Sequence, residues 1–427
     1  MAGASVSLDP APGRPPPPAG QGRSISPGAV PVVFESPSRV ARLAVGSDGE
    51  GVALRCILHL GMPKAGSSSI QESLFHGLRA PGFRYLSLGE VSGYRILMAA
   101  FDPEARDGDA LRRGNLDDEG VSRLRIRCLS ELGRRVERAS RRGQTLVLSS
   151  EGGWSMRQDG LAALRDFILE RGYAIEVLVY LRAAKGYLES EFQEQVKQVG
   201  GRFDDFLGAF RGFVDYATRL SILDEVFGCA RVEAAPFQPA RFPGGCVVRD
   251  FCARTRIPIP EGRIRRTNEG LSLPALKLLF AQRQFGRGYG TGLENVVRNE
   301  ILFRRLAELK GPPLRFRASL FEPLLAQLGP TFAEVERRIG ASLREGLGDD
   351  REAIGAESEL REFTSESLEW LARATGLPRV RETAGVEAAK AVAGQMQHLL
   401  DHPSLASRLR WHRMIAERRV ARLLRDV

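Results

Sequence analysis

The chain has 427 residues, a formal net charge of +10 at pH 7 and a pI of about 9.7, and only six of its 62 basic residues are lysines. This length can bury a large core, either as one α/β domain with helical additions or as two or three domains. The arginines are spread along the whole sequence, so the basic excess is weak support for an acidic substrate or a membrane surface. With no basic helix and no aromatic-rich RNA motif, we expect no nucleic-acid partner.

Cysteine usage and hydropathy favour a cytoplasmic protein. The five cysteines form no C-x-x-C pair and their number is odd, which favours reduced thiols. No apolar run reaches the roughly 18 residues of a membrane helix, so we expect no membrane span. Residues 1–51 are rich in Pro, Gly, Ser and Ala and lack a charged start followed by an apolar core. They predict a disordered tail and no secretory signal.

The first predicted elements form a strand, a loop and a helix. Residues 54–60 read as a buried strand, residues 61–66 as a tight Gly/Pro loop, and a helix begins at Ser67 and runs to about Arg79. A strand that leads into a Gly-rich loop and a helix N-terminus leaves several backbone N–H groups directed at one point. The helix dipole also favours negative charge there. This stretch therefore predicts an anion-binding site.

The spacing of the loop residues distinguishes this site from a nucleoside triphosphate loop. In the pattern G-x-x-x-x-G-K-[ST], Gly61 and Gly66 fit and Ser68 fills the Ser/Thr place, but Ser67 occupies the lysine position. The lysine instead lies inside the loop, as Lys64, where it should meet the bridging oxygen of a shorter anhydride. A plain strand-to-helix turn with a chance pair of glycines is the alternative.

Residues 61–71, Gly-Met-Pro-Lys-Ala-Gly-Ser-Ser-Ser-Ile-Gln, resemble the 5′-phosphosulfate loop of sulfotransferases that use 3′-phosphoadenosine-5′-phosphosulfate (PAPS). They look most like bacterial members that act on carbohydrates. The resemblance covers residues 54–273 well and continues loosely to about residue 371. It implies an α/β fold with a P-loop-type central parallel sheet of about five strands, flanked by helices, and a helical C-terminal extension. It also implies that the cofactor is bound by Lys64, Ala65, Gly66, Ser67, Ser68 and Ser69.

Two further strands follow. Residues 83–88 predict the second strand, and residues 117–142 predict a helix with apolar residues at a helical period. Residues 144–151 predict the third strand, which ends at Glu151. Ligands of open α/β sheets bind outside the carboxyl ends of the strands, so Glu151 is expected to line the same crevice as Lys64.

The fourth strand, residues 174–181, is nearly all apolar and is therefore predicted to be central. Arg182 follows it, and Ser190 lies eight residues later on a predicted helix. In the resembled family, a strand-end Arg and a helical Ser at this spacing hold the nucleotide 3′-phosphate. The family often has Pro where this chain has Ala184. The alternative is an Arg182 paired with a surface carboxylate such as Glu189.

The remainder of the resembled region ends in a basic segment. A helical stretch, a fifth strand and another helix are predicted over residues 203–227, 230–237 and 247–255. Ser272 is predicted to cap the helix that follows. The resemblance implies that Arg266 and Asn268, with Arg265 less securely, contact the nucleotide in a loop that closes over it. Gly270 departs from the family, which usually has Ser there, and a solvated surface is the alternative.

The C-terminal third is predicted to be Arg-rich and helical, and residues 386–427 to form one or two amphipathic helices. His398 and His402 have the spacing of a zinc helix, but Pro403 follows and no Cys or acidic ligand set is near, so a surface interpretation is favoured and no metal is expected. The predicted domains are a tail over 1–51, a sulfotransferase domain over 52–380 with a nucleotide core (52–273) and a helical part (274–380), and C-terminal helices over 381–427.

The resemblance implies transfer of a sulfuryl group from PAPS to a hydroxyl or amine of an acceptor, which we expect to be a saccharide or glycan. Lys64 would stabilise the charge on the leaving oxygen. Glu151 is the expected base, because carbohydrate sulfotransferases commonly use Glu; His59 or His76 is the alternative. A P-loop kinase with a displaced lysine and a non-catalytic nucleotide-binding scaffold stay open as alternative functions. The acceptor's identity and the oligomeric state are not predicted.

Overall fold

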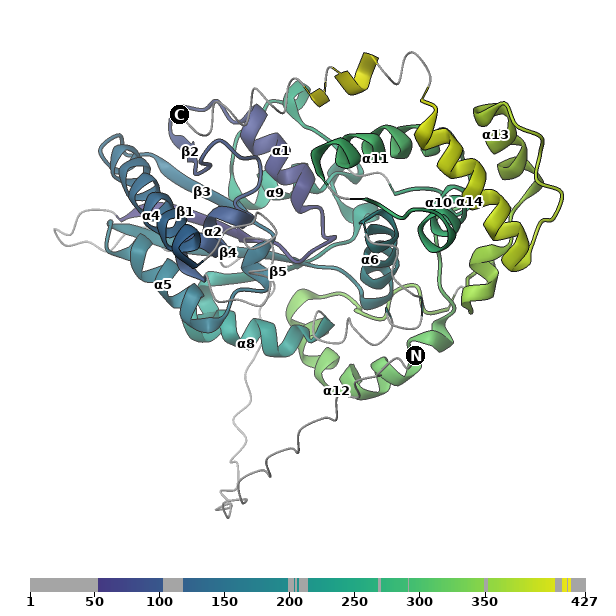
Figure 1. Cartoon of the computed structure of the whole chain (residues 1–427). Coiled ribbons are helices and arrows are strands. Elements are labelled where there is room, and N and C mark those ends of the chain that lie inside the picture. The colour runs from purple at the N-terminus through teal and green to yellow at the C-terminus, as the bar shows by residue number, and fades with distance from the viewer. Residues whose placement is uncertain are drawn as a thin grey trace, which may run out of the picture. The chain divides into compact units, whose positions relative to one another are not determined.

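The computed structural model describes residues 53–102, 118–198, 203, 206, 214–267, 270–290, 292–348, 352–403, 409–412 and 414–415 (Figure 1). The predicted disordered tail over residues 1–51 lies outside this part of the chain. So do most of residues 203–213, the first part of the helical stretch that was predicted over residues 203–227. Within the described residues, no helix is both long enough and apolar enough to cross a lipid bilayer.

A five-stranded sheet forms the centre of the structure. Its strands are β1 (Leu54–Leu60), β2 (Phe83–Tyr85), β3 (Thr145–Ser150), β4 (Tyr173–Leu181) and β5 (Val232–Pro236). They are ordered β2-β3-β1-β4-β5, and every neighbouring pair is parallel. The predicted α/β fold with a central parallel sheet is therefore confirmed. The middle strand, β1, lies between β3 and β4, so the carboxyl ends of these three strands are neighbours.

The strand β2 is shorter than predicted. The backbone N–H of Leu86 still bonds to the carbonyl of Val147 on β3, but Ser87 N–H turns back to the carbonyl of Tyr85 and Gly89 has a positive φ of 90°. The chain therefore leaves the sheet three residues before the apolar pattern of residues 83–88 ends. The pattern could not show this, because the apolar side chain of Leu86 is buried without belonging to a strand.

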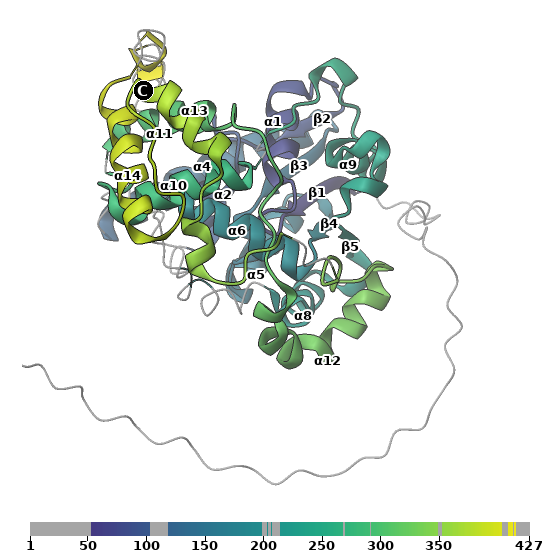
Figure 2. The same ribbon diagram turned by 90° about the vertical axis from the view of Figure 1, so that its right-hand side faces the viewer.

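Helices cover both faces of the sheet (Figures 1 and 2). They are α1 (Ser67–Gly77), α2 (Tyr94–Phe101), α4 (Asp118–Ser140), α5 (Gln158–Leu169), α6 (Ala184–Gln198), α8 (Tyr216–Phe227) and α9 (Val247–Thr255). Helix α1 packs against α9, whereas α5 packs against α2 and α8. The apolar period predicted for α4 is confirmed, because Cys128, Leu132 and Val136 are buried on one side of this helix.

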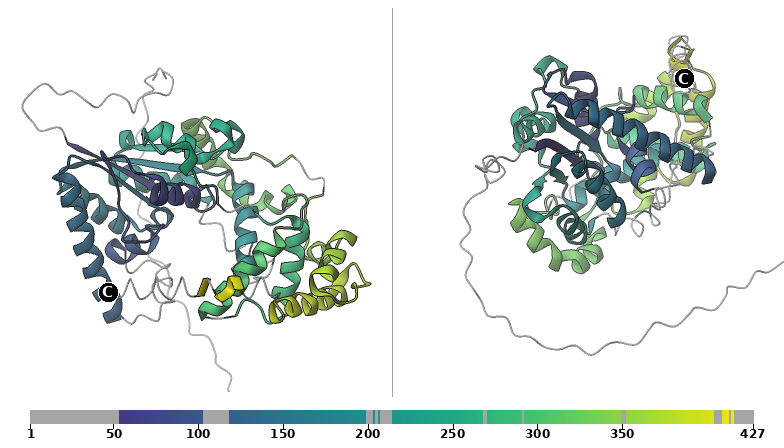
Figure 3. Two further views of the ribbon diagram at one scale, coloured as in Figure 1. Left: turned by 90° about the horizontal axis from the view of Figure 1, so that it is seen from above. Right: turned by 90° about the vertical axis from the view of Figure 1, so that its left-hand side faces the viewer.

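The C-terminal part is helical, as predicted. It contains α10 (Leu273–Phe285), α11 (Gly292–Leu306), α12 (Glu322–Ile339), α13 (Ser365–Thr375) and α14 (Gly385–Asp401). Ser272 caps α10, as predicted, by accepting a hydrogen bond from Ala275 N–H. Helix α14 packs along α10, and α10 packs against α6, so these helices continue outward from α6 (Figure 3). The predicted domain boundaries at residues 273 and 380 stay a proposal. The buried face of α14 belongs to the same hydrophobic core as the sheet.

Candidate active site

Three predicted site residues directly follow, or lie just beyond, the carboxyl ends of neighbouring strands. Lys64 lies in the loop after β1, Glu151 follows β3, and Arg182 follows β4. The parallel register pairs Leu60 with Ser150 and His59 with Leu178, so the three strands end at one edge of the sheet. This edge is where open α/β sheets bind their ligands. The topology therefore brings the three residues to one place.

Two left-handed residues shape the loop between β1 and α1. Lys64 has φ 62°, and Gly66, the N-cap of α1, has φ 82°. A Cβ atom on Gly66 would lie 2.8 Å from a methyl carbon of Val247 and 3.0 Å from the ring of Phe237, so this glycine is required for space as well as for conformation. Lysine at a positive φ is uncommon and costs of order 1–3 kcal/mol. The surrounding contacts must supply that free energy.

The N-terminus of α1 presents backbone N–H groups where the sequence predicts an anion-binding site. The first helical bond of α1 runs from Ile70 N–H to the carbonyl of Gly66. The N–H groups of Ser67, Ser68 and Ser69 therefore precede the helical bonding pattern and point out of the helix end. Ala65, between the two left-handed residues, is buried. The backbone of this turn has the geometry of an anion cradle.

The hydroxyls of Ser67 and Ser69 contact different parts of the chain. Ser67 is buried and its hydroxyl donates to a carboxylate oxygen of Glu151 over 3.3 Å, which links α1 to the end of β3. The hydroxyl of Ser69 accepts from Thr267 N–H at 3.1 Å, and that of Ser73, one turn later, accepts from Arg265 N–H at 2.9 Å. One face of α1 therefore holds the basic segment that the sequence placed late in the domain. Ser68 is half-buried.

The ammonium of Lys64 lies beside α6. Its Nζ is 3.3 Å from an oxygen of Glu194 and 3.9 Å from an oxygen of Glu191, and the Lys64 side chain is about one fifth exposed. Sequence reasoning missed both glutamates. They stand one and four residues after Ser190, three residues apart, a spacing that places two side chains on one face of a helix. This three-residue spacing is the sequence feature that could have indicated a pair of carboxylates on one face of the helix.

Glu151 is held in place by close packing of the turn that follows it. A Cβ on Gly152 would lie 2.3 Å from the ring of Tyr94, and one on Gly153 would lie 2.5 Å from Leu60. The guanidinium of Arg219 also donates to the carbonyl of Gly153 at 2.6 Å. These contacts fix the backbone next to Glu151.

The electrostatic surroundings of Glu151 suit a base. Burial raises the pKa of Glu151 above its ordinary value, and the ammonium of Lys64 and the hydroxyl of Ser67 oppose this shift without cancelling it. The carboxylate thus has a stronger affinity for a proton than an exposed Glu would have. A raised pKa in a strand-end crevice is typical of a functional carboxylate.

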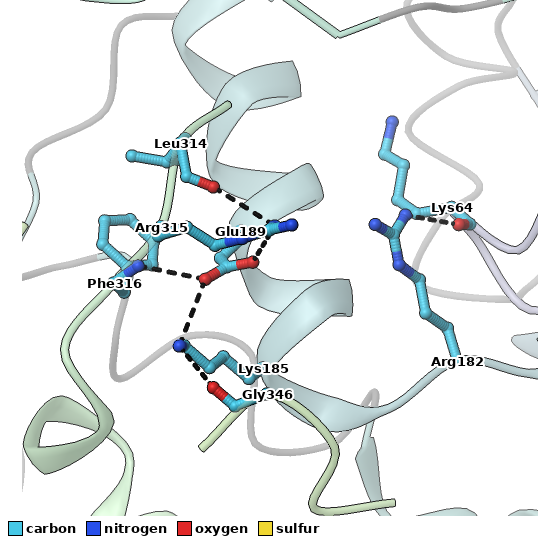
Figure 4. Close-up of polar contacts among 8 residues, drawn as sticks. All are labelled: Lys64, Arg182, Lys185, Glu189, Leu314, Arg315, Phe316 and Gly346. Carbon is cyan, nitrogen blue, oxygen red and sulfur yellow. Dashed lines mark hydrogen bonds and ion pairs between the residues drawn. The ribbon is translucent and has the colours of Figure 1, made fainter. Parts of the chain in front are cut away.

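Arg182 supports the loop. Its Nη1 donates to the carbonyl of Lys64 over 2.8 Å (Figure 4). The hydroxyl of Tyr216 donates to the carbonyl of Arg182 over 2.7 Å. Burial lowers the pKa of the guanidinium, whose carbon lies 5.6 Å from the ring centre of Phe237. Ser190 is half-buried on α6, the helix that begins two residues after Arg182.

Glu189 has a different role from the one considered as an alternative. It is buried, it accepts from Phe316 N–H at 3.0 Å and from Arg315 at 2.9 Å, and it lies 3.8 Å from Lys185. Lys185 in turn donates to the carbonyl of Gly346 at 2.6 Å. In Figure 4 this cluster and the Arg182–Lys64 bond lie on opposite sides of α6. The cluster therefore joins α6 to the C-terminal part and is not a surface partner of Arg182.

The basic segment is partly described. Arg266 is exposed, and its guanidinium donates to the carbonyl of Gly244 at 2.8 Å. Asn268 lies outside the described residues. Gly270 packs on α6: a Cβ there would come within 2.8 Å of the side-chain oxygen of Gln193.

The two alternative histidines differ in environment. His59 is fully buried in β1, its Nδ1 is 2.8 Å from the hydroxyl oxygen of Ser149, and burial lowers its pKa to about 3, so the ring is neutral. Its ring packs edge-on against Phe251. His76 lies at the end of α1 and is 3.3 Å from Glu72 on the same helix. His59 therefore behaves as a core residue.

Comparison with known proteins gives little independent information. No model of a known protein family matches the chain, and no curated protein matches it. Among solved structures, the chain is similar to the crystal structure of a sulfotransferase from Alicyclobacillus acidocaldarius, with 16% sequence identity and a TM-score of 0.37. The match covers 68% of this chain and 98% of that chain.

The packing around Gly66 makes a stability prediction. We expect Gly66→Ala to lower the free energy of unfolding by about 2–4 kcal/mol, of which about 1 comes from the positive φ and the rest from overpacking against Val247. The control is Gly172→Ala, because Gly172 has φ 77° but a Cβ there would meet nothing within 4 Å. This variant should lose only about 1 kcal/mol. Urea unfolding followed by circular dichroism measures both, and equal losses would contradict the packing argument.

Proposed function

We propose that the protein is a sulfotransferase that moves a sulfuryl group from PAPS to a hydroxyl or amine of an acceptor. The observation that carries the proposal is the position of Lys64, inside the loop and ahead of Gly66. Its ammonium is directed toward α6, and its positive charge lowers the pKa of Glu151 against the effect of burial. A lysine there lies at the turn itself, whereas a triphosphate-binding lysine begins the helix. This arrangement suits a short anhydride that ends in sulfate.

Each part of PAPS has a proposed partner. The 5′-phosphosulfate would be bound by the N–H groups of the turn from Ala65 to Ser69 and by Lys64. The 3′-phosphate would be bound by Arg182 and the hydroxyl of Ser190. A guanidinium has five N–H donors, and the carbonyl of Lys64 takes one from Arg182, so donors remain for a phosphate. Arg266 and Asn268 are proposed to approach the nucleotide from the basic segment.

In the proposed reaction, an acceptor oxygen or nitrogen attacks sulfur in line with the bond to the 5′-phosphate. The new bond to sulfur forms as the bond from sulfur to the bridging oxygen breaks, and that oxygen leaves with the bonding electron pair. Lys64 and the N–H groups of the turn stabilise the charge that develops there. Glu151 takes the proton that the acceptor loses. The products are the sulfated acceptor, adenosine 3′,5′-bisphosphate and a protonated Glu151.

The competing functions make different demands on the same residues. A kinase would need a lysine at the start of α1 to reach the β- and γ-phosphates, and this chain has Ser67 there, with its hydroxyl on Glu151. A scaffold without turnover would not need a carboxylate with a raised pKa next to the loop lysine.

We propose a saccharide or glycan as the acceptor, because residues 61–71 resemble the loop of carbohydrate sulfotransferases. We also propose a cytoplasmic location.

The direct test is transfer of radiolabelled sulfate from PAPS to a panel of saccharides. We expect the wild-type protein to label at least one acceptor, and Lys64→Ala to lower the rate by about 10²–10³-fold, because a preorganised charge at the leaving oxygen is lost. Lys310→Ala is the matched control, since Lys310 is exposed and, among the residues that the structure describes, its ammonium bonds only to the carbonyl of Ala307. An unchanged rate in Lys64→Ala would contradict the proposal, and tight nucleotide binding without transfer would favour a scaffold.

The raised pKa of Glu151 predicts the pH dependence of the rate. The base must be ionised to accept a proton, so activity should rise with pH through a pKa above the usual range of Glu. Glu151→Gln should lower the turnover rate by about 10²–10⁴-fold and remove this rising limb from the pH profile. A rising limb that persists in Glu151→Gln would show that another group, such as His76, is the base.

A further inference from the structure

The resting position of Lys64 conflicts with its proposed task. Its Nζ lies 3.3 Å from Glu194 and 3.9 Å from Glu191, so the ammonium that should meet an anionic donor is already paired with two carboxylates. All three side chains are about one third exposed or less, so solvent screens this pair less than it would a surface pair. The donor therefore has to compete with α6 for Lys64.

Helix α6 is anchored to other parts of the chain at both ends. Near its start, Lys185 bonds to the carbonyl of Gly346, and Glu189 bonds to Phe316 N–H. At its end, the buried guanidinium of Arg283 donates to the carbonyls of Val196 and Lys197 over 3.1 Å and 3.0 Å. The two carboxylates thus sit on a helix that is anchored at both ends. Release of Lys64 must come from side-chain rotation.

From this geometry we infer that Glu191 and Glu194 are positioning residues that hold Lys64 in a resting ion pair, which an anionic nucleotide must break in order to bind. This inference rests on the proposed function, because it takes adenosine 3′,5′-bisphosphate as the nucleotide product. The ion pair weakens nucleotide binding in two ways. It occupies the ammonium, and it leaves two carboxylates beside the bound anion once the ammonium has moved.

The competition between the two glutamates and the nucleotide for the Lys64 ammonium depends on pH. The charged groups that act on the two glutamates are Lys64 from the loop, Glu151 from the end of β3 and Lys197 from α6. Burial raises the pKa of Glu191, whereas for Glu194 the ammonium of Lys64 and the side chain of Gln198 outweigh burial and lower the pKa. A bound anion that draws Lys64 away would raise both pKa values, so nucleotide binding takes up protons and weakens as pH rises.

The test is calorimetric titration of the full chain with adenosine 3′,5′-bisphosphate at two pH values. We expect Glu194→Gln to bind it about tenfold more tightly than the wild type, and Glu191→Gln to show a change in the same direction, because each removes one negative charge near the anion. Glu137→Gln, on the exposed side of α4, changes the net charge equally and should leave the affinity unchanged. The wild type should lose affinity with rising pH more steeply than Glu194→Gln does.

A double-mutant cycle separates release of Lys64 from simple repulsion. In a Lys64→Ala background only repulsion remains, so Glu194→Gln should tighten binding less than it does with Lys64 present. Equal tightening in both backgrounds, an unchanged or weakened affinity in Glu194→Gln, or equal tightening in Glu137→Gln would overturn the ion-pair inference. A wild-type protein that does not bind the bisphosphate at all would overturn the proposed function instead.

Discussion

The hydrogen bond from Arg182 to the carbonyl of Lys64 joins the two halves of the candidate site. Lys64 has a left-handed backbone that lysine rarely adopts, and a guanidinium at the end of β4 stabilises it. Gly66 supplies the second left-handed residue where a side chain would collide with Val247. Because β4 lies beside β1 in the sheet, the strand order itself brings Arg182 to the loop. In the proposed complex, the same arginine would support the loop and bind a nucleotide phosphate.

Helix α6 is the second structural element on which the site depends. Along one helix, Glu189 turns inward and fixes the helix to the C-terminal part, whereas Glu191 and Glu194 turn to Lys64. Burial of Glu189 without its partners would be costly, so Arg315 and Phe316 are needed for the helix to stay in place. The C-terminal helices therefore contribute to the site indirectly, by holding α6. This gives the helical extension a structural role in the proposed reaction.

The sequence predicted the fold better than the contacts of the site. Strands β1 and β4 are mostly apolar, and the loop from residue 61 to residue 66 has an unusual spacing, so both were visible without coordinates. Two hydrogen bonds could not be predicted, because each joins residues far apart in the sequence. They run from Arg182 to the carbonyl of Lys64 and from Arg219 to the carbonyl of Gly153. The carboxylates of Glu191 and Glu194 were also missed, since charged residues on a helix usually face solvent.

In the proposed function, the site recognises a 3′-phosphorylated adenine nucleotide through Arg182 and Ser190. The most direct test compares the affinities of adenosine 3′,5′-bisphosphate and adenosine 5′-phosphate in the wild type and in a variant with both residues replaced by alanine. We predict that the wild type prefers the bisphosphate by about 100-fold, the order expected for a charge-assisted contact to one phosphate, and that the variant loses this preference. A wild type that binds both nucleotides equally, or a variant that keeps the preference, would contradict the account.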